Sequence, residues 1–148
     1  MEVHMIKTRL ITDFINSLIG QPRVYGENDC NLIACKIIDI HTGSDLYQKL
    51  HKNYDSIADG LKKSKSLCGY SNILQPIKEN FSLVEGELED GDLLVTEHKL
   101  GNRKYYSVSP YFSGYALIAE NDVWVARPVF ETNFDFAYRF GGGLYVIR

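Results

Sequence analysis

The chain has 148 residues, of which 45% are hydrophobic and 24% are charged, and its formal net charge is −3. This composition predicts one folded domain, residues 1–148, with a core of its own, and it excludes an intrinsically disordered chain. The slight negative charge gives no basis for nucleic-acid binding, which needs a basic surface.

The first predicted element is an amphipathic helix over residues 6–19. Apolar residues recur there at intervals of three and four, and Gly20 and Pro22 end the pattern. A full apolar face is what a helix needs to cover the core of its own domain, so we expect this face to be buried. A helix that binds a partner is the alternative. The apolar positions are Ile6, Leu10, Ile11, Phe14, Ile15, Leu18 and Ile19.

The second predicted helix begins at Cys30, and its apolar positions continue at helical spacing to Ile38. Asn28 or Asp29 can cap its first turn, and Gly43 suits its C-terminal end. The positive end of a helix dipole favours a thiolate, which makes Cys30 a candidate nucleophile. The alternative is a cysteine that packs in the core as a small hydrophobic residue.

Short helices are expected over residues 45–68 and 71–80, which completes a helical half of about 6–80. From residue 81 to residue 148 the pattern becomes that of strands. A charged loop is expected over 97–104. The expected strand cores are 93–95, 105–108, 115–119, 123–126 and 144–147. Helices followed by strands predict an α+β fold with a small antiparallel sheet of four to six strands.

Aromatic residues are concentrated late in the chain. The segment 130–138 contains several of them and has no single hydrophobic period. Aromatic side chains bury large areas at low entropic cost, so this segment is a candidate docking surface for a partner. Rings that only cover the sheet are the alternative.

The cysteines and the apolar stretches set further limits. Three cysteines without a Cys-x-x-Cys pair argue against a zinc site and a disulfide framework, and we expect no metal and no cofactor. The start of the chain has no signal-peptide pattern, and no apolar stretch approaches the ~20 residues that cross a bilayer. We therefore expect a protein that is made in a cytoplasm and has no membrane span.

The segment around Cys30 resembles a known family. Tyr25-Gly26 followed by Asp29-Cys30-Asn31 is similar to the signature of NlpC-type papain-like cysteine peptidases, and more so to small tail-associated proteins of bacteriophages and prophages that share this scaffold. The resemblance implies a papain-like fold whose cysteine opens a helix packed on the sheet, and it covers roughly 22–139. Further matching positions are Gly43-Ser44-Asp45, the Tyr-containing stretch 54–61, Gly91-Asp92 and Tyr138-Arg139.

The resemblance also assigns catalytic positions. Cys30 occupies the nucleophile position, but the base, a histidine in the peptidases, falls on Gly114. The orienting residue falls on Val125 or Ala126, and neither can hold an imidazole. A cysteine nucleophile needs a base within hydrogen-bond reach, and His98 is the substitute that this sequence offers.

Two functions follow as expectations. The first is a structural component of a bacteriophage tail tip or baseplate, made in the host cytoplasm and incorporated into the virion, with other tail proteins or copies of itself as partners and no peptidase activity. The second is a cysteine peptidase or amidase that cleaves murein peptides with Cys30 as nucleophile and His98 as base. A binding module that uses the late aromatic residues is a third possibility.

Overall fold

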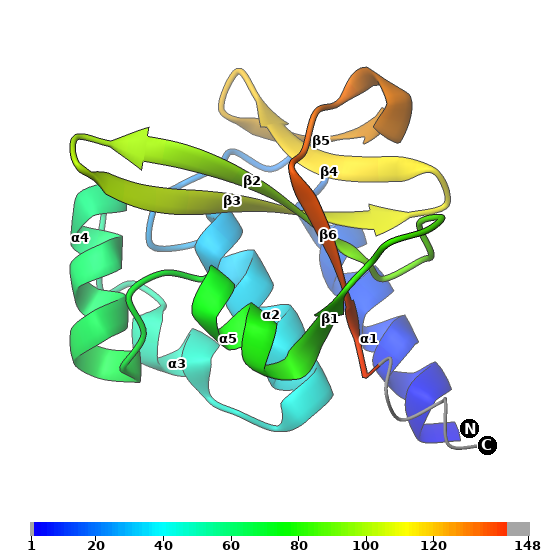
Figure 1. The fold of residues 1–148 in the computed structure, drawn as a ribbon, viewed down its shortest axis with the longest axis horizontal. Coiled ribbons are helices and arrows are strands. Elements are labelled where there is room, and N and C mark those ends of the chain that lie inside the picture. The colour runs from blue at the N-terminus through cyan, green and yellow to red at the C-terminus, as the bar shows by residue number, and fades with distance from the viewer. Residues whose placement is uncertain (1, 142–148) are drawn as a thin grey trace.

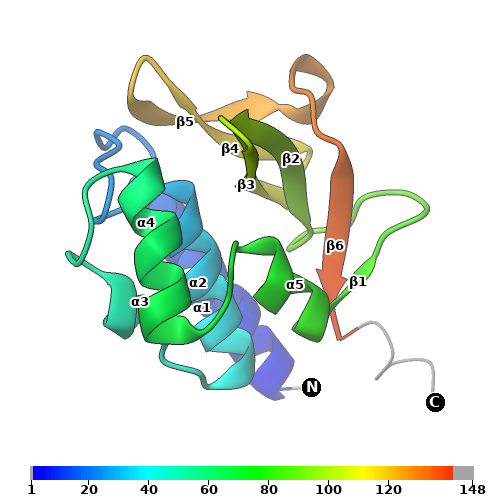
Figure 2. The same cartoon turned by 60° about the vertical axis from the view of Figure 1, so that its left-hand side comes forward.

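The computed structural model of the chain describes residues 2–141, and the side chains from residue 5 onward. Helices lie against one side of a six-stranded sheet (Figure 1, Figure 2), and every pair of neighbouring strands is antiparallel. The predicted α+β class is therefore confirmed. The helices are α1 (Glu2–Leu18), α2 (Cys30–Thr42), α3 (Leu46–Leu50), α4 (Ile57–Lys63), the π-helix η1 (Ser64–Cys68), α5 (Leu74–Asn80) and the 3-10 helix η2 (Val129–Glu131).

The sheet has the strand order β1-β6-β2-β3-β4-β5. The hairpins β2–β3 and β4–β5 form its larger part (Figure 1). Strand β6, the last described strand in the sequence, lies between β1 and β2. The strands are β1 (Phe81–Leu83), β2 (Leu93–Leu100), β3 (Arg103–Phe112), β4 (Tyr115–Glu120), β5 (Val123–Pro128) and β6 (Phe136–Phe140).

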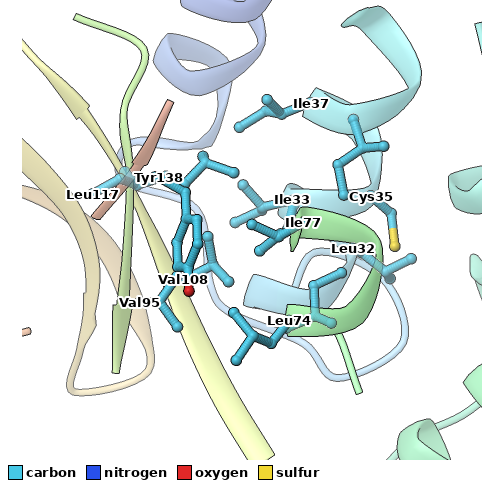
Figure 3. Close-up of a cluster of buried hydrophobic side chains, with 14 of the residues drawn as sticks. Leu32, Ile33, Cys35, Ile37, Leu74, Ile77, Val95, Val108, Leu117 and Tyr138 are labelled. Atoms are coloured by element: carbon cyan, nitrogen blue, oxygen red, sulfur yellow. The ribbon is translucent and has the colours of Figure 1, made fainter. Parts of the chain in front are cut away.

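Helix α2 forms the centre of the core. Six of its side chains are at most 1% exposed, and burial of each large one contributes about 1.5–3 kcal/mol. Figure 3 shows Ile33 and Ile37 of α2 facing Val95 and Val108 of the sheet. The predicted helix start at Cys30 is confirmed. The six buried residues are Leu32, Ile33, Ala34, Cys35, Ile37 and Ile38.

Helix α1 differs from its prediction in two ways. It begins at Glu2 rather than at residue 6, and only part of its apolar face is buried. Ile11 and Ile15 are covered, whereas Ile6 and Leu10 are 57% and 51% exposed. Ile6 and Leu10 lie one turn apart on the flank of the buried stripe, so the contact with the core is narrower than the apolar pattern.

The predicted charged loop at 97–104 is wrong. Strand β2 continues to Leu100 and β3 begins at Arg103, so these residues form the tip of a hairpin that turns at Gly101, where φ is +62°. Pairs across the two strands stabilise the tip, among them an ion pair of 3.5 Å between Lys104 Nζ and Glu97 Oε2. His98 is therefore a strand residue.

The late aromatic segment is divided between the core and the surface. Strand β6, which the sequence did not predict, pairs with β1 and β2 and buries Tyr138 against the core. Phe130 is 84% exposed, and Phe134 and Phe136 are about half as exposed as Phe130. The predicted strand at 144–147 lies outside the described residues.

Candidate functional site

The start of α2 is held by a buried carboxylate. Asp29 is 3% exposed, and its Oδ1 accepts from the backbone N–H of Leu32 at 3.1 Å, which is the N-cap that the sequence predicted. Its Oδ2 accepts from the backbone N–H of Gly26 at 2.7 Å. The hydroxyl of Tyr54 lies 2.8 and 2.7 Å from the two oxygens and donates to this carboxylate. Both carboxylate oxygens of Asp29 thus accept hydrogen bonds from the main chain and from Tyr54.

Gly26 is required where this loop meets the segment before α4. Its φ is +87°, and a Cβ built at this position would lie 1.7 Å from the carbonyl oxygen of Tyr54. The carbonyl of Gly26 accepts from the backbone N–H of Lys52 at 2.6 Å, and Asn31 Nδ2 lies 3.2 Å from the Tyr54 hydroxyl. Gly26, Asp29 and Asn31 of the quoted signature therefore form one hydrogen-bonded network with Tyr54.

Cys30 lines a cavity of about 420 Å³ that lies between the start of α2, helix α4 and the hairpins β2–β3 and β4–β5. Burial and, less strongly, the adjacent Asp29 carboxylate raise the pKa of its thiol to about 11, although the nearby backbone N–H of Val108 acts to lower it. The raised pKa favours the neutral thiol at pH 7, whereas the sequence predicted that the helix end would favour the thiolate. The helix end does favour a negative charge, but the buried Asp29 already occupies that position, and a second anion beside it is unfavourable.

His98 lines the same cavity as Cys30. Its Nε2 lies 2.8 Å from Ser107 Oγ, and its ring stacks on Tyr105 at 4.9 Å between centroids. Within the described part of the chain, His98 forms its side-chain hydrogen bond with Ser107 and not with Cys30.

The register of β2 and β3 explains why His98 and Cys30 do not form a dyad. Val95 pairs with Val108, which contacts Cys30, whereas His98 pairs with Tyr105. Tyr105 lies three residues from Val108, which is roughly 10 Å along the strand and on the opposite face of the sheet. Cys30 contacts β3, and His98 lies on the neighbouring strand β2, on the side of β3 that is away from β4.

The other catalytic positions assigned by the resemblance lie away from the thiol. Gly114 is in the turn between β3 and β4 with φ +85°, and neither it nor Val125 nor Ala126 lines the cavity. The residue of β5 that does line it is Trp124, which is 2% exposed and donates from Nε1 to the carbonyl of Asn28 at 3.0 Å.

Sequence reasoning did not find Val108 and Trp124 as neighbours of Cys30. Both are apolar strand residues, and no chemical signal distinguishes them from core residues. Trp124 is the only tryptophan of the chain, which is the one feature that could have drawn attention to it.

The site holds no metal-binding set. Among the side chains of residues 5–141, no group of three or more His, Cys, Asp or Glu could hold a metal ion. None of the helices within residues 2–141 is long and apolar enough to cross a membrane.

Comparisons with known proteins give one match. The family model described as "Domain of unknown function (DUF6950)" matches residues 2–129. No curated protein and no solved structure matches the chain.

Proposed function

The chain belongs to the DUF6950 family, and we propose that it is a structural component of a bacteriophage tail tip or baseplate, built on an NlpC-like papain scaffold that does not cleave peptides. The observation that carries the proposed lack of peptide cleavage is the state of Cys30. Burial and the neighbouring Asp29 raise its pKa to about 11, so the thiol is protonated at pH 7.

The surroundings of Cys30 support a scaffold without hydrolytic activity. A peptidase needs a base to take the thiol proton, and general-base catalysis contributes roughly 100- to 10,000-fold to the rate. The nearest ionisable neighbour is Asp29, whose oxygens already accept from two backbone N–H groups and the Tyr54 hydroxyl. The histidine in the cavity, His98, forms a hydrogen bond with Ser107 instead.

The papain-like scaffold is supported by the arrangement around α2. Cys30 is the first residue of this helix, the helix packs on an antiparallel sheet, and the quoted signature residues meet in the Asp29 network. The assignment to a phage tail rests on the resemblance of these residues to small tail-associated proteins.

Purified phage particles provide the test. In particles of the phage whose genome carries this chain, mass spectrometry is expected to find the protein at a fixed ratio to the tail proteins. Removal of the gene is expected to give particles without a complete tail tip, and a copy with Cys30→Ala is expected to restore them. Absence of the protein from purified particles would overturn the tail proposal.

Murein digestion distinguishes the peptidase from the scaffold. Purified protein is incubated with murein peptides, and the products are measured by mass spectrometry. No cleavage above that of the Cys30→Ala protein is expected. Cleavage that the Cys30→Ala change abolishes would instead identify a peptidase.

A further inference from the structure

The sheet is split between β3 and β4. These neighbouring strands pair only next to their turn, where Tyr111 pairs with Ala116 and Phe112 with Tyr115. The next residue of β3, Pro110, has no N–H to donate, so the ladder loses a hydrogen bond where it would continue. Beyond this point each strand pairs only with its other neighbour, and the ends of the two hairpins lie apart in Figure 1.

Main-chain groups of β3 point into this split. The carbonyl of Val95 accepts from the N–H of Asp135 on the β6 side, so Val95 and its partner Val108 do not exchange hydrogen bonds. The N–H and C=O of Val108 therefore point away from β2, and those of Tyr106, two residues along, do the same. Among the described residues neither has a ladder partner across the split.

Main-chain groups of β4 point into it from the other side. Asn121 and Asp122 form the tight turn of the β4–β5 hairpin, with φ of +53° and +62°, so the flanking pair of Glu120 and Val123 is hydrogen-bonded. By alternation, the N–H and C=O of Ala119 point away from β5 and toward β3. Within the part of the chain that the structure describes, Tyr106 and Ala119 thus present main-chain groups without a ladder partner on the two sides of the split, whereas the N–H of Val108 lies near the thiol of Cys30.

The cavity that contains Cys30 occupies the split. Its walls include residues 105–109 of β3 and Ile118 and Ala119 of β4. Tyr106 and Val108 face the helices, where Cys30 lies. The opposite face of β3 carries the hydroxyls of Tyr105, Ser107 and Ser109.

We propose that an extended peptide segment of a partner protein binds in this split as an added strand, with its main chain paired to Tyr106 of β3 and Ala119 of β4. Unpaired strand edges are usually blocked or covered, and peptide recognition by strand addition uses groups of this kind. The alternating walls predict an occupant of about five residues, apolar toward Cys30 and polar toward Ser107. The inference rests on the proposed function in that the segment is held and not cleaved.

Peptide selection tests this inference. A display library of random ten-residue peptides is selected on the immobilised protein, and the Kd of an enriched synthetic peptide is measured by titration calorimetry. Selected peptides are expected to alternate apolar and polar residues. The Tyr106→Pro protein, which lacks the N–H that points into the split, is expected to bind about tenfold more weakly or worse. The comparison variant, Tyr106→Phe, keeps both this N–H and the ring that lines the cavity, and it is expected to bind more tightly than Tyr106→Pro.

A second measurement does not depend on how Tyr106→Pro folds. Methylation of alternate backbone nitrogens of the selected peptide removes the donors along one of its edges, and it is expected to weaken binding to the unchanged protein by about tenfold or more. The inference would be overturned if no peptide is enriched by the selection, or if the methylated and unmethylated peptides bind equally well. If the protein instead cleaves a bound peptide with Cys30 as nucleophile, the proposed function is wrong. Failure of the inference and failure of the proposed function are therefore distinguishable.

Discussion

Arg139 of β6 holds the carboxylate of Asp92, at the start of β2, with two parallel hydrogen bonds: Nε to Oδ1 at 2.8 Å and Nη2 to Oδ2 at 2.9 Å. Asp92 is completely buried, and its Oδ2 also accepts from the backbone N–H of Glu89. These two residues belong to separate motifs of the quoted resemblance, and neither lines the cavity that contains Cys30. They fasten the last described strand to the centre of the sheet.

Arg139→Ala is expected to destabilise the protein by about 3 kcal/mol, because it leaves the buried carboxylate of Asp92 without its cation. Urea unfolding followed by circular dichroism measures this loss. Glu89→Gln is the control, since Glu89 is well exposed and its ion pair with Arg139 is 3.3 Å long, so a change below about 1 kcal/mol is expected. Similar losses in the two variants would contradict a special role of Asp92.

Gly26→Ala is expected to destabilise the protein by about 3 kcal/mol or more, because the new Cβ would meet the carbonyl oxygen of Tyr54. Gly43→Ala is the matched control. Gly43 has a similar φ of +78° but open space around the added Cβ, so only the backbone strain of about 1–2 kcal/mol is expected. Thermal unfolding of both proteins separates the steric contact from the strain.

Tyr54→Phe removes the hydroxyl that donates to Asp29 and leaves the ring in place. We expect a loss of about 1.5–3 kcal/mol in the free energy of unfolding, because a buried carboxylate loses a hydrogen bond. Tyr106→Phe removes a more exposed hydroxyl that lies 3.4 Å from Glu97, and it is expected to cost less than about 1 kcal/mol. An equal effect of the two changes would argue against the importance of the Asp29 network.

Alkylation of Cys30 with iodoacetamide is expected to accelerate only as the pH approaches about 11, since burial and Asp29 raise the pKa of this thiol from the ordinary 9.0. Mass spectrometry reads the labelling of each cysteine separately, and free glutathione in the same tube serves as the unperturbed reference. Below pH 9 we expect Cys30 to react far more slowly than glutathione. Rapid labelling near pH 7 would show a stabilised thiolate and favour the peptidase.

The parts of the fold that were predictable from the sequence have local causes. The start of α2 was predictable because Asp29 caps it within three residues, and its end because Gly43 adopts a positive φ. The hairpin tip at 97–104 was not, because its charged residues resemble a loop until the cross-strand partners are known. Strand β6 was missed for the same reason, since its partners Phe81 and Leu93 are distant in the sequence.

The candidate site divides in a similar way. The position of Cys30 at a helix start followed from the pattern, and His98 does line its cavity. The raised pKa of Cys30 could not be predicted, because it depends on burial and on the carboxylate of Asp29, which Tyr54 helps to hold in place from 25 residues away in the sequence. The register that separates His98 from Val108 is likewise a property of strand pairing.

The split beside β3 starts at Pro110, whose ring nitrogen has no N–H to donate toward β4. Substitutions of the residues that line the split can therefore alter which sequence fits there without closing the sheet. Related chains that retain a proline at this position are free to diverge in partner while they keep the same architecture.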